Sequence, residues 1–128
     1  MSALRPVVYD AGALIVAERN HLAFWRAHRS YLTAGGVPVT PAPVVAQVWR
    51  DGARQAQLAR LLKGCDVADL EHGLARSVGE LLGRSGTSDP VDGAVTVIAA
   101  HVGAAVLTSD PDGIRHLLSY LGQAGGRT

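Results

Sequence analysis

The sequence predicts a three-layer α/β protein, with a central parallel sheet and helices on both of its faces. Short β-branched runs alternate with longer segments in which apolar residues recur every three or four positions. The segments between successive strands are long enough for helical crossovers, which parallel strands require. The chain of 128 residues is 48% hydrophobic and 18% charged, which suits one domain with a well-buried core.

The first half of the chain is expected to contain two strands and the helices that connect them. The expected elements, in chain order, are a strand at 4–9, helices at 11–19 and 20–33, and a minimal strand at 37–39. Thr40 and Pro41 are typical of an N-cap and a first helical turn. A further helix is therefore expected to begin at Thr40 and to run to Trp49.

The second half continues the alternation of strands and helices. The expected elements are a helix at 53–63, a strand at 65–70, helices at 71–83 and 89–102, a strand at 104–108 and a last helix at 110–121. Gly64 and Gly103 are expected to end the helices that they follow. A polar loop is expected at 84–88 and a loose tail at 122–128.

Charge and cysteine content narrow the possible functions. Twelve Lys and Arg against eleven Asp and Glu give a net charge of +1, which argues against non-specific coating of nucleic acid. The single cysteine, Cys65, excludes an internal disulfide and a thiolate metal site, and it suits the reducing cytoplasm. No membrane span is expected, because prolines and Gly103 interrupt the two longest stretches without charged side chains.

Three aspartates are expected to meet at the carboxyl edge of the sheet. Asp10 follows the first strand, Asp110 follows the last, and Asp92 lies in the first turn of the intervening helix. Ligands bind at this edge of an open parallel sheet, because loops and helix N-termini converge there. Helix capping explains any one aspartate taken alone. Two carboxylates about 4 Å apart, however, repel by about 4 kcal/mol at an effective dielectric near 20, so a cluster predicts a bound cation.

The residue types of such a cluster indicate which cation it would bind and which reaction that cation would support. Carboxylate oxygens without cysteine or paired histidine ligands favour Mg²⁺ or Mn²⁺ over Zn²⁺. These ions keep water ligands, bind phosphate oxygens and lower the pKa of a water that can attack phosphorus. The aspartates therefore favour hydrolysis of a phosphodiester.

Four segments spread from Val7 to Leu117 carry a family resemblance. They are VVYDAGALI, VTPAPVVAQVWR, DPVDGAVTVIAAHVG and AVLTSDPDGIRHL. Their order and spacing resemble the PIN-domain ribonucleases, most closely the VapC-type toxins of bacterial toxin–antitoxin pairs. The resemblance implies a single PIN-like domain over 1–128 with metal-dependent endoribonuclease activity. It also implies tRNA or rRNA as substrate, a cognate antitoxin as partner, and pairing of toxin chains into homodimers.

The resemblance further implies roles for individual residues. Asp10 would anchor a Mg²⁺ or Mn²⁺ ion, Asp92 would hold it from the helix start, and Asp110 would complete the site or position the attacking water. Four more residues are implied nearby: the accessory acid Asp112, the hydroxyl residues Thr108 and Ser109, and Asp89. Asp89 would cap the helix and could contact a metal ligand without binding the metal itself.

Two positions depart from the family pattern. Gln47 stands where the family has a glutamate, so the site lacks one negative charge, and Gly12 stands where many relatives have Ser or Asn. A second hypothesis is therefore a PIN-like module with weakened catalysis that acts by binding RNA or a protein. A third, another α/β phosphate enzyme or a receiver domain, is disfavoured because Ala11 and Gly12 follow Asp10 where those sites have a second acid.

The remaining polar and aromatic residues are expected to be structural. The basic residues of the middle helices, expected to be solvated rather than to bind RNA phosphates, are Arg50, Arg54, Arg60 and Lys63. The aromatic residues expected in the core or at partner contacts, rather than as stacking platforms, are Phe24, Trp25, Tyr31 and Trp49. His116 is the histidine most suited to a phosphate contact, and the other four are expected at the surface. Cys65 is expected to be a small buried apolar residue.

Overall fold

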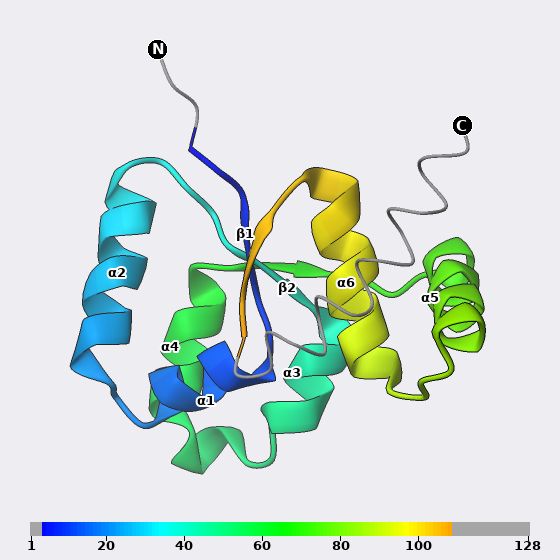
Figure 1. Ribbon diagram of the computed structural model, residues 1–128. Coiled ribbons are helices and arrows are strands. Elements are labelled where there is room, and N and C mark those ends of the chain that lie inside the picture. Colours follow the sequence, from blue (N-terminus) through cyan, green and yellow to red (C-terminus); the bar gives the residue numbers. More distant parts are fainter. Residues whose placement is uncertain (1–3, 109–128) are drawn as a thin grey trace.

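The computed structural model describes residues 4–108 and confirms the predicted α/β class. Four parallel strands form one sheet in the order β3-β2-β1-β4. The strands are β1 (Val7–Tyr9), β2 (Val39–Pro41), β3 (Asp66–Ala68) and β4 (Ala105–Leu107). Helices lie on both faces of the sheet, α2 and α4 on one and α6 on the other, with α5 packed outside α6 (Figure 1).

Six α-helices and one short 3₁₀ helix are described between the strands. They are α1 (Ala11–Glu18), α2 (Leu22–Thr33), α3 (Ala42–Val48), η1 (Gly52–Arg54), α4 (Ala56–Lys63), α5 (His72–Ser85) and α6 (Pro90–Val102). Gly86 and Gly103 follow α5 and α6 with φ of 72° and 68°, a left-handed backbone that glycine adopts without steric cost. Gly103 therefore ends its helix as predicted, and Gly64 follows α4.

Several boundaries differ from the predicted ones, and side-chain contacts explain the differences at Thr40 and Gln55. Thr40 does not cap α3 but belongs to β2, where its buried hydroxyl donates to the Tyr9 carbonyl oxygen at 3.0 Å. Gln55 divides the helix predicted at 53–63, because its backbone leaves the helical region with φ −121° and ψ 47°. The end of α5 reaches Ser85, inside the predicted loop.

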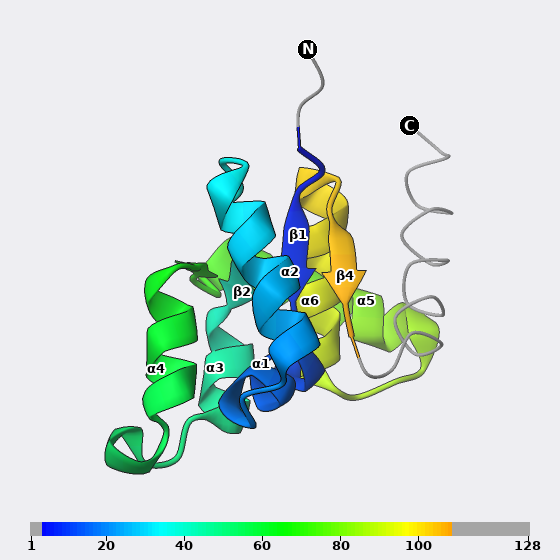
Figure 2. The ribbon, with the colours of Figure 1, turned by 90° about the vertical axis from the view of Figure 1, so that its left-hand side faces the viewer.

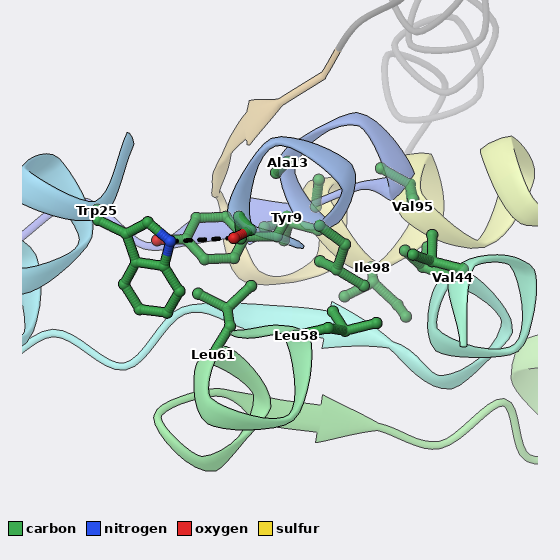
Figure 3. Packing of buried hydrophobic residues seen from close by; sticks show 13 residues of the cluster. Tyr9, Ala13, Trp25, Val44, Leu58, Leu61, Val95 and Ile98 are labelled. Carbon is green, nitrogen blue, oxygen red and sulfur yellow. Dashed lines mark hydrogen bonds between the residues drawn. The ribbon is translucent and has the colours of Figure 1, made fainter. Parts of the chain in front are cut away.

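The hydrophobic core lies between the sheet and the helices that cover it. Its fully buried side chains include Val8 of β1, Leu14 of α1, Leu58 and Leu61 of α4 and Val95 of α6. Figure 3 shows such side chains meeting between α4 on one side and α6 on the other. The core therefore fixes the helices against the strand ends that form the candidate site.

Trp25 extends this core along α2. Its indole Nε1 donates to the Ala17 carbonyl oxygen at 3.0 Å, and the Arg60 guanidinium lies 4.4 Å from the ring centroid. Trp25 is therefore a core residue, as predicted, and Arg60 packs its charge on an aromatic face. No helix in the described part of the chain is long and apolar enough to cross a membrane. The helix predicted at 110–121 and the tail at 122–128 lie outside the described residues.

Candidate functional site

The candidate site lies where the chain reverses the order in which strands are added to the sheet. From β1 the chain adds β2 and then β3 on one side, and it returns through α5 and α6 to place β4 on the other. Crossovers on opposite faces leave a crevice at the carboxyl ends of β1 and β4, the position where open α/β sheets bind ligands. Figure 2 shows the arrows of β1 and β4 pointing towards the end of the molecule where α1 begins.

Asp10 and Thr108 occupy equivalent positions at this edge. Tyr9 pairs with Leu107 across β1 and β4, so Asp10 and Thr108 are the next residue along each strand. The Asp10 amide also donates to the Leu107 carbonyl oxygen at 3.1 Å. The sheet thus brings together two residues that lie almost a hundred positions apart in the sequence, as their expected placement at strand ends required.

The Asp10 carboxylate is buried and caps α1. Only 6% of the residue is exposed, and its Oδ1 accepts a hydrogen bond of 3.3 Å from the Ala13 amide. No Arg, Lys or His within residues 4–108 forms an ion pair with Asp10. A buried carboxylate is costly unless it is hydrogen-bonded, paired or bound to a metal, and within residues 4–108 every fully buried side-chain oxygen has a hydrogen-bond partner. The capping and metal-binding interpretations of Asp10 are therefore compatible.

Asp92 lies in the first turn of α6, close to the same edge. The helix runs antiparallel to β4, so its first turn lies at the carboxyl end of the sheet (Figure 2). Gly93 is buried here, and a Cβ atom at Gly93 would be 2.8 Å from Val78 Cγ1. This close packing against α5 fixes the first turn, on which the half-buried Asp92 side chain lies.

Asp89 and Gln47 lie at the periphery of the site. The exposed Asp89 carboxylate accepts hydrogen bonds from the Val91 and Asp92 amides at 2.9 and 3.3 Å, which confirms its predicted capping role. Gln47 is exposed on α3, and its side chain forms no hydrogen bond with another residue in the range 4–108. Within residues 4–108, neither residue belongs to a cluster of acidic side chains that could hold a metal ion.

The described residues supply only part of the predicted metal site. Within 4–108, no three Asp, Glu, His or Cys side chains lie close enough together to hold a metal ion. Asp10 and Asp92 are the predicted ligands that fall in this range, whereas Ser109, Asp110 and Asp112 lie outside the described residues. The cluster of three or four carboxylates therefore stays a prediction.

Two cavities flank β4 and α2, and neither was predicted from the sequence. A cavity of about 220 Å³ borders the site and is lined by Gly12, Ala13, Val16, Phe24, Leu107 and Thr108. A second, of about 480 Å³, continues along α2 past Phe24 and Leu107 to Tyr31. Both are predominantly apolar, so they suit apolar side chains better than phosphate groups.

The wall of the larger cavity contains a buried polar pair. The Tyr9 hydroxyl lies 2.8 Å from His28 Nδ1, and 3% of His28 is exposed, so the prediction of a surface histidine was wrong. Burial lowers the pKa of His28, with smaller contributions from Arg29 and Arg60. The signal for burial was its spacing, because His28 follows Trp25 by three positions and so shares its helix face. Burial also raises the pKa of the Cys65 thiol to about 12, but Cys65 is half-buried, so its predicted burial is confirmed only in part.

No family model matches the chain, and no curated protein matches it. The geometry at the ends of β1 and β4 and the four resembling segments are therefore the basis for a functional proposal.

Proposed function

We propose that the chain is a Mg²⁺-dependent endoribonuclease of the VapC toxin type, which hydrolyses RNA phosphodiester bonds with a metal-activated water. The observation that supports this most strongly is the buried Asp10 carboxylate at the β1–β4 crevice, which has no cationic partner within residues 4–108. A cation at this position would compensate the buried charge. Asp92, in the first turn of α6 at the same edge, offers a second carboxylate.

The donor set fits a hard divalent ion. Asp10 and Asp92 would hold Mg²⁺ or Mn²⁺, with Asp110 and Asp112 as the further ligands that the resemblance implies. When bound, such an ion supplies a nucleophilic water at neutral pH and positive charge against the phosphate. The Ala13 amide orients the Asp10 carboxylate through the capping bond. The hydroxyls of Thr108 and Ser109 are suited to donate hydrogen bonds to a phosphate oxygen.

Cleavage of RNA by the pure protein tests this proposal. Wild-type protein should cleave labelled total RNA in Mg²⁺ and lose this activity in EDTA. Asp10→Asn should reduce cleavage at least about 100-fold. It removes a charged ligand of the metal ion, and such an ion contributes several kcal/mol of transition-state stabilisation. Asn caps helices about as well as Asp, so the fold should be retained.

The matched control is Asp51→Asn. Asp51 also caps a helix, accepting a hydrogen bond from the Ala53 amide at 3.1 Å, but the helix is η1. Asp51→Asn should not reduce cleavage, because it removes no charge from the metal site. Equal cleavage by wild type and Asp10→Asn, with both folded, would refute the assignment of Asp10.

A protein partner forms part of the proposal. The cavity of about 480 Å³ beside α2 has an apolar lining of a size that takes several side chains of a docked segment. A cognate antitoxin is the partner that the resemblance implies, together with homodimers in the cytoplasm. Light scattering on a size-exclusion column tests the dimer, which should give about twice the 13.3 kDa mass of one chain.

A PIN-like binding module with weakened catalysis is the second candidate function. Gln47 favours it, because a neutral, exposed amide stands where the family has a glutamate. In that case wild-type protein would bind RNA or a protein without Mg²⁺-dependent cleavage. Restored cleavage in Gln47→Glu would identify the missing charge as the cause.

A further inference from the structure

The α3–α4 connection presents an aromatic side chain to solvent at Trp49, a residue predicted to lie in the core or at a partner contact. Trp49 is 37% exposed, whereas Trp25, the other tryptophan, is 4% exposed. Trp49 is the most exposed Phe, Trp or Tyr residue in the described range. Other large apolar side chains are also exposed, such as Leu22 at 64%, so Trp49 is distinguished by its flat aromatic face and not by its exposure.

The backbone around Trp49 is held in place by a buried glutamine. Gln55 Oε1 accepts hydrogen bonds from the Arg50 and Asp51 amides at 2.7 and 2.9 Å. Its Nε2 donates to Glu18 Oε1 at 2.7 Å and to the Val48 carbonyl oxygen at 3.0 Å. The turn after Trp49 is thereby tied to the end of α1, and a contact made there would cost little ordering entropy.

The Trp49 ring itself is also supported. A Cβ atom at Gly52 would lie 2.6 Å from Trp49 Cζ2, so the indole rests directly on the Gly52 backbone. Only glycine at this position allows such a close approach. The backbone supports part of the ring, and the exposed remainder is available to a binding partner.

Two arginines, Arg50 and Arg54, lie close to Trp49 in the sequence. Arg50 Nη1 donates to the Ala46 and Trp49 carbonyl oxygens at 3.0 and 2.8 Å, which holds its charge at the end of α3. The Arg54 side chain is 88% exposed and makes only a 3.7 Å contact with Asp51 Oδ2, a weak surface ion pair. The Arg54 guanidinium therefore remains available to an anionic partner.

The position of this surface relates it to the candidate metal site. The helix α3 begins directly after β2, the neighbour of β1 in the sheet, and so starts at the same carboxyl edge as Asp10 (Figure 2). Its seven residues rise by about 10 Å in total. Trp49 is therefore about one short helix away from that edge.

We propose that Trp49, Arg50 and Arg54 form a contact surface for single-stranded RNA, with a base stacked on the Trp49 indole and a phosphate bound by Arg54. A fixed aromatic ring beside available cations is the combination with which proteins hold single strands without reading their sequence. This inference rests on the proposed ribonuclease function and concerns how the substrate is held, not how it is cleaved.

RNA binding without cleavage tests the inference. All variants are made in the Asp10→Asn protein, and the probe is a fluorescein-labelled 12-nucleotide single-stranded RNA of mixed sequence, followed by anisotropy. Trp49→Ala should weaken binding about 5- to 150-fold, whereas Trp49→Phe, which keeps a stacking face, should remain within about fivefold of the parent. Arg54→Ala should make the dependence of log K on log salt shallower, reducing the magnitude of its negative slope by about 0.7.

Two matched controls lie far from this surface. Val102→Ala removes an exposed apolar side chain at the end of α6, and Arg84→Ala removes an exposed arginine of α5. Both should bind RNA as the parent does. Unchanged RNA binding in Trp49→Ala, or no binding by the parent, would overturn the inference. Failure of wild-type protein to cleave RNA would instead count against the ribonuclease proposal, so the two failures are distinguishable.

Discussion

His28 should make the stability of the fold depend on pH in a direction that the structure fixes. The residue is 3% exposed, and its imidazole packs against the rings of Phe24 and Trp25 and lies 2.8 Å from the Tyr9 hydroxyl. Burial lowers the pKa of His28 below its usual 6.5, with help from the charges of Arg29 and Arg60. The folded protein therefore disfavours the imidazolium, which the unfolded chain forms freely below pH 6.5.

The sign and size of the effect follow from this difference. The contribution of His28 is fully present above about pH 6.5 and is lost as the pH falls, because the unfolded state then takes up a proton that the folded state does not. One such group changes the free energy of unfolding by at most about 1.4 kcal/mol per pH unit. Between pH 7.5 and 5.5 the loss cannot exceed about 1.4 kcal/mol, which is the value for a folded state that takes up no proton at all.

Urea unfolding at pH 7.5 and 5.5, followed by circular dichroism, measures this loss. The comparison is with His28→Gln, which keeps a hydrogen-bonding group near Tyr9 but does not titrate. Wild type should lose more stability on acidification than the variant, since the carboxylates and the exposed histidines are common to both. Parallel pH dependences in the two proteins would refute the interpretation of His28.

Two further predictions concern packing, and thermal or urea unfolding checks both. Gly93→Ala should destabilise the protein by about 0.5–2 kcal/mol, because the new methyl would meet Val78 Cγ1 at 2.8 Å and this overlap outweighs the gain in helix propensity. A stabilised Gly93→Ala protein would contradict the close packing of α5 on α6. Leu58→Ala should cost about 2–5 kcal/mol, because Leu58 is completely buried. Leu22→Ala, at a residue 64% exposed, is its control and should stay within about 0.5 kcal/mol of wild type.

The elements that depend on local chemistry were predictable from the sequence. Asp89 before Pro90 gives both an acceptor for free amides and a preset φ, and α6 begins at Pro90. Gly103 ends the same helix in the left-handed region. Local pattern also placed Asp10 correctly at the junction of β1 and α1.

The errors arose where distant contacts decide. Thr40 has the sequence features of a cap, but its hydroxyl bonds to the Tyr9 carbonyl oxygen across the sheet, and only the pairing of β1 with β2 creates that acceptor. His28 is polar, yet Tyr9 and two aromatic rings bury it. Trp49 is the reverse case, because helical spacing favours burial, whereas α3 ends at Val48 and the Gln55 contacts hold the turn that follows.

For the candidate site, sequence reasoning identified the sheet edge but not its surroundings. The alternation of strands and helices implied that Asp10 and Thr108 end parallel strands, and the strand order makes those strands neighbours. The apolar cavities beside Phe24 and Leu107 depend on how α2 packs against the sheet, and the sequence pattern does not predict that packing. The contribution of Asp110 stays a prediction, because that residue lies outside the described range.

Binding of Mn²⁺ by the purified protein, measured from the loss of the free-ion electron paramagnetic resonance signal, tests the central claim most directly. Wild-type protein and Asp51→Asn should bind the ion with the same affinity, and Asp10→Asn should bind it at least about tenfold more weakly, because it lacks a charged oxygen ligand. Equal Mn²⁺ affinity in wild type and a folded Asp10→Asn protein would contradict the claim that the end of β1 holds a divalent cation.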